Sequence, residues 1–172
     1  MNYSDLSRKF SDTVENQEKA VFNTLFIAAN KLQTLFDGRI PEVSLKQFML
    51  LSVVRHAEGP QTFTQLGALL GCSRQNIKKL AAVLEKKGFI AIEQSPLDSR
   101  AMCICPTEKV ESFFQNEFAQ YQRELRHLFA VYTDEEITAL FHLLTKLYEG
   151  IDHLAAVTDS EPIYRKDKEE NE

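Results

Sequence analysis

A segment of the chain, residues 73–79, carries side chains whose chemistry suits double-stranded DNA. Arginine can donate two parallel hydrogen bonds to guanine, glutamine and asparagine can bond adenine, and lysine suits phosphate oxygens. The positive N-terminal end of a helix adds to the attraction for phosphate. The residues with this chemistry are Ser73, Arg74, Gln75, Asn76, Lys78 and Lys79.

The net charge of the 172-residue chain, −5, argues at first against a nucleic-acid partner. The charge is unevenly distributed, however. Between Cys72 and Lys109 there are seven basic and four acidic residues, 7 − 4 = +3, which leaves −8 for the rest of the chain. A basic module on an acidic body is expected of a protein that meets DNA on one face.

Other chemistries find little support in the residue spacing. No glycine-rich phosphate loop, nucleophile elbow or metalloprotease motif occurs, so we expect neither an enzyme nor a cofactor. Cys103 and Cys105 lack the paired spacing of a zinc site, and no ligand cluster accompanies His142 and His153, which predicts no metal. Cys72 precedes a helix start and leaves a thiol-based redox sensor open, although a small apolar turn residue is the plainer interpretation.

Capping boxes predict where helices begin. The pattern Ser/Thr-x-x-Glu/Gln occurs at Ser44, Thr62 and Thr133, and Ser73 is a further N-cap. Apolar residues at spacings of three and four follow each of these positions, as expected for one face of a helix. Apolar spacing alone predicts a first helix over about residues 14–36, and the next three helices cover about residues 44–56, 62–70 and 73–87.

The apolar period then changes from 3.6 to 2 residues. Phe89–Glu93 and Ala101–Cys105 predict two short strands joined by a long loop. One long helix marked by apolar residues from Val110 to Leu128, and another from Ile137 to Leu154, follow. A helix-turn-helix followed by a β-hairpin is a winged helix, so the predicted fold class is mainly α with a small β-hairpin wing.

The fourth helix has one apolar face, formed by Ile77, Leu80, Ala81 and Leu84. The candidate DNA-binding side chains lie outside that stripe and near the N-terminal end, where recognition helices meet base edges. A solvated charged surface is the usual meaning of a lysine-rich helix. The tight turn at residues 71–73 between two short helices favours DNA binding instead.

The block from Ser73 to Lys109 resembles the MarR family of bacterial transcription regulators. The resemblance is carried by Leu80-Ala-Ala-Val-Leu-Glu-Lys-Lys-Gly-Phe-Ile90, by Asp98-Ser-Arg100, and by Pro106-Thr-Glu-Lys109. It extends over about residues 14–155. Ser99 replaces the first wing arginine of the family, and Pro106 and Val110 replace its usual leucine and glycine.

The resemblance implies how the chain meets DNA. Residues 73–79 would enter the major groove, and Arg100 would reach the adjacent minor groove from the wing. Asp98 would hold the wing or this arginine in place, although an exposed ion pair in a simple turn is the alternative. The resemblance also implies a homodimer in which the terminal helices interlock. The candidate interface residues are Leu140, Leu144, Leu147 and Ile151.

Members of the family bind small, often aromatic or phenolic, ligands in a crevice between the winged lobe and the long helices. Aromatic residues of this chain that suit the walls of such a crevice also suit an ordinary core, and both roles stay open. The candidate ligand-pocket residues are Phe22, Phe26, Phe48 and Phe113.

The predicted organisation has four parts, and it combines a winged helix-turn-helix with a helical dimerisation region. The chain lacks an apolar run of about 20 residues and a signal-peptide core, so we expect a cytoplasmic protein with no membrane partner. The parts are an N-terminal arm and dimerisation helix (1–36), the winged lobe (37–109), C-terminal dimerisation helices (110–156) and a charged, disordered tail (157–172).

The predicted function is sequence-specific transcriptional regulation, by a ligand-responsive repressor that binds a pseudo-palindromic DNA operator as a homodimer. Two alternatives remain open at this point. One is a thiol-based redox-sensing regulator that acts through Cys72. The other is a winged-helix protein interaction module, which has no need of a basic recognition helix.

Overall fold

A computed structural model of the chain describes residue 5 and residues 8–10, 12–39, 42–96, 98–116 and 118–160, with the side-chain surroundings of 118–121 and 159–160 left out. Much of the predicted N-terminal arm before residue 12, and the predicted tail from residue 161 onward, lie outside the described residues. The chain divides into two compact units, Met1–Tyr121 and Gln122–Glu172.

The first unit begins with a long helix, α2 (Val14–Asp37), which agrees with the predicted helix over 14–36. Thr13 caps its start by accepting a hydrogen bond from the Asn16 backbone N–H at 3.2 Å. Near its other end Phe36 is buried, and an Asp37 carboxylate oxygen accepts from the Leu45 N–H at 2.6 Å. The end of α2 is therefore tied to the start of the next helix.

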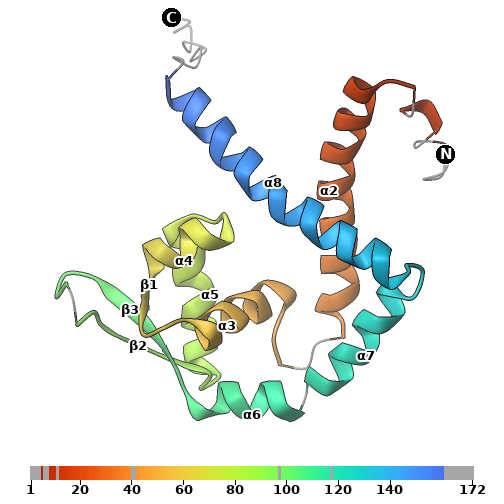
Figure 1. The fold of residues 1–172 in the computed structure, drawn as a ribbon. Helices are drawn as coiled ribbons and strands as arrows, with labels where there is room; N and C mark the ends of the chain where they lie inside the picture. Colours follow the sequence, from red (N-terminus) through yellow and green to blue (C-terminus); the bar gives the residue numbers. More distant parts are fainter. Residues whose placement is uncertain are drawn as a thin grey trace, which may run out of the picture. The chain divides into compact units, whose positions relative to one another are not determined.

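The helix-turn-helix consists of α3 (Leu45–His56), α4 (Phe63–Leu70) and α5 (Arg74–Lys86), as shown in Figure 1. Both predicted capping boxes are present, at Ser44 and at Thr62. Helix α4 ends at Gly71, whose φ of 63° lies in the left-handed region that favours glycine. The predicted helix boundaries are confirmed here because these caps bond only residues three or four positions away.

The wing is part of a three-stranded antiparallel sheet with the order β1-β3-β2. Strands β2 (Ile90–Gln94) and β3 (Met102–Pro106) begin one residue later than predicted. The Phe89 N–H bonds the Leu84 carbonyl at 3.0 Å and so completes the end of α5 instead of joining the ladder. Strand β1 (Gln61–Thr62) was not predicted, because two residues carry no alternation.

One core joins α3, α4, α5, the sheet and the next helix, α6 (Glu108–Asn116). The core side chains that these elements contribute are at most 5% exposed. The largest contributors are Leu50, Leu51, Val54, Leu66, Ile77, Leu84, Phe89, Ile104, Val110, Phe113 and Phe114.

Where one long helix was predicted after Pro106, the structure describes helical residues on both sides of residue 117, in α6 and in α7 (Phe118–Phe129), and residue 117 itself lies outside the described residues. The apolar face of α6 is buried in the core of the first unit, whereas the second unit begins within α7. The apolar spacing in the sequence continues from α6 into α7, and it does not record that the second unit begins within α7.

The second unit contains the end of α7 and the 27-residue helix α8 (Asp134–Ser160). The predicted capping box at Thr133 is present, with Glu136 as its partner. Helix α8 continues past residue 157, where the tail was expected to begin. Its apolar side chains are largely exposed, among them Leu143 at 67% and Leu154 at 63%. In the described part of the chain, no helix has both the length and the apolar character to cross a membrane.

Candidate nucleic-acid interface

Helix α5 has two faces of opposite character. Ile77, Ala81 and Leu84 are 0% exposed and lie in the core, and Leu80 is half-buried at the edge of the same stripe. The other face and the first turn are exposed to solvent. The exposed side chains near the N-terminal end are Arg74, Gln75, Asn76, Lys78 and Lys79.

Ser73 lies at the start of this helix. Its side-chain oxygen accepts a hydrogen bond from the Asn76 N–H at 3.2 Å, as an N-cap does. The first turn of α5 contains no acidic residue. The unpaired backbone donors of that turn and the adjacent cationic side chains therefore attract anions together.

The turn between α4 and α5 depends on Gly67, which the sequence analysis did not single out. The Cys72 N–H donates to the Gly67 carbonyl at 2.9 Å, and a Cβ on Gly67 would lie 2.7 Å from the Cys72 oxygen. Only glycine admits such a close approach without a shift of backbone. A glycine inside an amphipathic helix was the available signal, since it usually has a packing reason.

The wing presents an arginine whose base is fixed and whose tip is free in solvent. One Asp98 carboxylate oxygen accepts from the Arg100 N–H at 3.0 Å and from its Nε at 3.2 Å. The Arg100 side chain is 91% exposed. The Ala101 N–H adds a bond to the Asp98 carbonyl at 2.9 Å, which closes the turn. Asp98 therefore holds both the turn and the first part of the arginine side chain.

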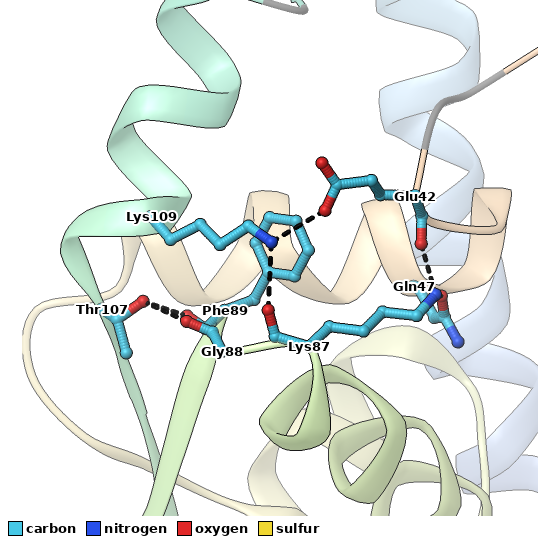
Figure 2. A network of polar contacts seen from close by, with 7 residues as sticks. All are labelled: Glu42, Gln47, Lys87, Gly88, Phe89, Thr107 and Lys109. Carbon is cyan, nitrogen blue, oxygen red and sulfur yellow. Dashed lines mark hydrogen bonds and ion pairs between the residues drawn. The ribbon is translucent and has the colours of Figure 1, made fainter.

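The excess of three positive charges between Cys72 and Lys109 does not lie wholly on the candidate DNA-binding face. This corrects the expectation from the sequence that the whole excess marks the surface that meets DNA. Lys87 and Lys109, two of the seven basic residues, bond to Glu42 and to the C-terminal end of α5, as Figure 2 shows. That end is opposite to the candidate DNA-binding turn. The basic residues that remain at the exposed first turns of α5 and at the wing are Arg74, Lys78, Lys79 and Arg100.

The cysteines occupy three different environments. Cys72 is half-buried, and its Sγ donates to the Leu70 carbonyl at 3.5 Å. Cys103 is buried, and burial together with the nearby Cys103 and Glu93 raises the pKa of the Cys105 thiol to about 11. Cys105 is thus a protonated, weakly reactive thiol at neutral pH. No cluster of metal-ligating side chains occurs among the residues that the structure describes.

The four candidate ligand-pocket residues lie in two different environments. Phe22 and Phe26 are 62% and 59% exposed on α2, with ring centroids 5.0 Å apart. Phe48 is half-buried and Phe113 is 5% exposed, and both rings contact Phe114, at 5.4 and 5.6 Å. Phe113 therefore belongs to the core of the first unit, whereas the α2 pair is uncovered.

The candidate interface residues form one stripe on α8. Leu140 is half-buried, and Leu144, Leu147 and Ile151 are 44%, 38% and 52% exposed. Their spacing of four, three and four residues places them on one side of the helix. These partly exposed apolar residues therefore lie together along one side of α8.

Comparison with known proteins agrees with this fold. Residues 42–101 match the model of the MarR family. The uncharacterised HTH-type transcriptional regulator YcgE of Bacillus subtilis is 31% identical over 88 residues, 51% of this chain and 57% of the relative. The chain therefore matches little more than half the length of that relative.

Two solved structures share the fold over most of their length. Sco3205, a MarR family transcriptional regulator from Streptomyces coelicolor in complex with DNA, is 22% identical, with 80% of this chain and 89% of that chain covered and a TM-score of 0.68. BpsR of Bordetella bronchiseptica, whose DNA binding is regulated by 6-hydroxynicotinic acid, is 18% identical, with 81% and 95% covered and a TM-score of 0.65.

The matched segment coincides with the helix-turn-helix and most of the wing, the elements that carry the exposed basic side chains. The fold expected from the sequence is therefore confirmed over these elements, including the mainly helical class with a small sheet. Residues 42–101, which form the winged helix-turn-helix, are thus similar to the MarR family, and the chain shares the fold of solved MarR family structures.

Proposed function

We propose that this protein is a transcriptional regulator that binds a specific DNA sequence through the N-terminal end of α5. The observation that carries the proposal is the division of α5 into a fully buried face and an exposed basic one. A helix packed in this way is rigid, and its free side chains include arginine, glutamine and asparagine, which read base edges. The family match supports the same function.

In the proposed complex, α5 enters the major groove and Arg100 reaches into the neighbouring minor groove. Asp98 limits the motion of this arginine, which lowers the entropy lost when it binds. The solved DNA complex of Sco3205 is consistent with a protein of this fold on DNA. A homodimer, joined through the exposed stripe on α8, would place two α5 helices on two half-sites about 34 Å apart.

We further propose a repressor that releases its operator when a small aromatic acid or phenol binds. BpsR, which responds to 6-hydroxynicotinic acid, has the same fold and supports this class of effector. The exposed pair Phe22 and Phe26 offers aromatic surface for such a ligand. Coupling of about 1–3 kcal/mol would lower operator affinity roughly 5- to 150-fold, and DNA would weaken ligand binding by the same factor.

The proposal is tested by comparing two substitutions on the exposed face of α5. Arg74→Ala should cost about 1–3 kcal/mol in binding to the operator and should relax the preference at one base position. Lys79→Ala should instead weaken binding to operator and unrelated DNA alike, and it should reduce the salt dependence. Fluorescence anisotropy at several salt concentrations measures both effects.

Equal binding of operator by Arg74→Ala and the wild type would show that this face does not read bases. If neither substitution changes DNA binding at any salt concentration, the exposed face would fit a winged-helix protein interaction module instead. Ala82→Ser is a suitable control, because Ala82 is exposed on α5 about two turns after Arg74 and the substitution changes no charge. It should leave both affinities unchanged.

A further inference from the structure

The C-terminal end of α5 is held by a group of polar contacts that the DNA-binding proposal does not use (Figure 2). Lys109 Nζ donates to a Glu42 carboxylate oxygen at 2.7 Å and to the Lys87 carbonyl at 3.0 Å. It also lies 4.2 Å from the centre of the Phe89 ring. One ammonium group thus joins the start of α6, the end of α5 and the segment before α3.

Lys87 completes the group from the other side. It is the C-cap of α5, and its side-chain Nζ donates to the Glu42 carbonyl and to the Gln47 Oε1, the latter at 3.5 Å. The same Gln47 oxygen accepts from the Ser44 N–H in the capping box of α3. We call Glu42, Lys87 and Lys109 the α5 clamp, because each bonds at least one of the others.

The backbone of Glu42 supports a specific role for the clamp. Among the described residues, Glu42 is the one non-glycine residue with a positive φ, 63°. This conformation costs energy for a side chain with a Cβ and persists where surrounding contacts impose it. Here Lys109 binds the side chain of Glu42 and Lys87 binds its carbonyl. The strained residue is therefore held over the end of α5 from both sides.

The position of the clamp matters because α5 is a lever. Its 13 residues span about 20 Å, so a tilt of about 10° at the clamped end moves the first turn by roughly 3 Å. Hydrogen bonds to base edges tolerate only a small part of that movement. The core fixes the middle of the helix through Ile77, Ala81 and Leu84, and the clamp fixes its far end.

We propose that Glu42, Lys87 and Lys109 are positioning residues that set the orientation of α5 for sequence-specific DNA binding, without touching DNA. The proposal rests on the function proposed above. When the clamp is broken, the protein should distinguish its own DNA sequence from other sequences less well, while its affinity for unrelated DNA should not fall. A simple stabilising role would weaken all DNA binding equally, or none of it.

The structure provides a matched control in the pair Arg55 and Glu111. This pair joins α3 to α6 through two hydrogen bonds, at 2.7 and 2.8 Å, and bypasses α5. The carboxylate side chains have nearly equal exposure, 48% for Glu42 and 49% for Glu111. Glu42→Gln and Glu111→Gln each remove one negative charge, so both should strengthen binding to unrelated DNA slightly and equally.

The experiment uses the full chain and a duplex of about 30 base pairs that the wild type selects from a random pool, long enough for two half-sites. A scrambled duplex of equal length reports unspecific binding. Glu42→Gln should weaken binding to the selected duplex about fivefold, which corresponds to the largest energies measured for exposed ion pairs. This loss should appear even though the removal of a negative charge by itself favours DNA binding. Glu111→Gln should not. Lys109→Gln should act like Glu42→Gln, and the double variant should be no worse than Lys109→Gln.

A second measurement does not depend on DNA. Hydrogen exchange of the amides of Lys87, Gly88 and Phe89 should accelerate in Glu42→Gln and Lys109→Gln, and should stay unchanged in Glu111→Gln. Thermal unfolding confirms that each variant is folded at the assay temperature.

The outcomes separate the two proposals. Equal binding of the selected duplex by Glu42→Gln and Glu111→Gln would overturn the clamp and leave the DNA-binding function standing. A similar loss on both duplexes would overturn it as well, because the effect would then be a loss of folded protein. A wild type that enriches no sequence would remove the proposed function, and the positioning role with it.

Discussion

Helix α5 and helix α8 are both amphipathic, yet their apolar residues have different surroundings. Ile77, Ala81 and Leu84 of α5 are 0% exposed, whereas Leu144 and Leu147 of α8 remain 44% and 38% exposed. The winged lobe and α6 thus complete a core within one chain. Helix α8 presents apolar side chains that remain exposed in the described chain, and the proposed dimer would cover them. The difference teaches that similar apolar patterns can end in a buried core in one place and in an exposed face in another.

The largest expected effect tests this difference with two leucines. Leu84→Ala in α5 should lower the free energy of unfolding by about 2–5 kcal/mol, since it leaves a cavity in a closed core. Leu147→Ala in α8 should instead weaken the dimer. Urea unfolding measures the first effect, and sedimentation at several protein concentrations measures the second.

The comparison predicts that Leu84→Ala leaves the dissociation constant of the dimer unchanged. If Leu147→Ala lowers stability as much as Leu84→Ala and the protein is a monomer throughout, then α8 is covered by its own chain. That result would remove the assembly role that we assign to the α8 stripe.

Substitution of two glycines by alanine should change the stability of the fold by smaller amounts, and in opposite directions. Gly67→Ala places a Cβ 2.7 Å from the Cys72 backbone oxygen, and this overpacking should cost about 1–3 kcal/mol. Gly150→Ala lies inside α8, where a Cβ meets nothing within 4 Å, and should stabilise by about 0.5–1 kcal/mol. Thermal unfolding of both variants measures the two shifts.

Destabilisation by Gly150→Ala would show that another surface approaches α8 at this glycine. Because Gly150 lies three residues after Leu147 on the helix, such a result would locate the partner subunit closely. A neutral Gly67→Ala would mean that the turn between α4 and α5 adjusts freely. The orientation of the recognition helix would then depend less on that turn.

The smallest expected effect concerns pH. The Arg55 guanidinium, which donates two hydrogen bonds to Glu111, holds the pKa of that carboxyl below its ordinary 4.5. Because the folded-state pKa is the lower one, the pair stabilises the fold above about pH 4.5, and this contribution is lost as the pH falls through the folded-state value. Urea midpoints between neutral pH and pH 3 should therefore fall less in Glu111→Gln than in the wild type. Parallel curves would contradict the role of this pair.

Much of the fold was predictable because its signals are local. The capping boxes at Ser44, Thr62 and Thr133 bond residues three positions away, and each is present in the structure. The change of apolar period at Phe89 likewise located the wing to within one residue. The exposed face of α5 was predictable for the same reason, since its buried stripe follows from helical spacing. Whether its residues bind DNA stays a prediction.

What the sequence by itself determined was therefore where the capped helices begin, where the wing lies to within one residue, and which side of α5 is apolar. Only the tertiary structure showed that Lys87 and Lys109 are tied to Glu42, that Gly67 admits the approach of Cys72, and that a two-residue strand joins the sheet. It also placed the boundary between the two compact units inside α7. The physical reason is distance along the chain: a cap or a period is written within a few neighbouring residues, whereas Glu42 and Lys109 meet across 67 positions, and nothing in the residues around either one specifies the other.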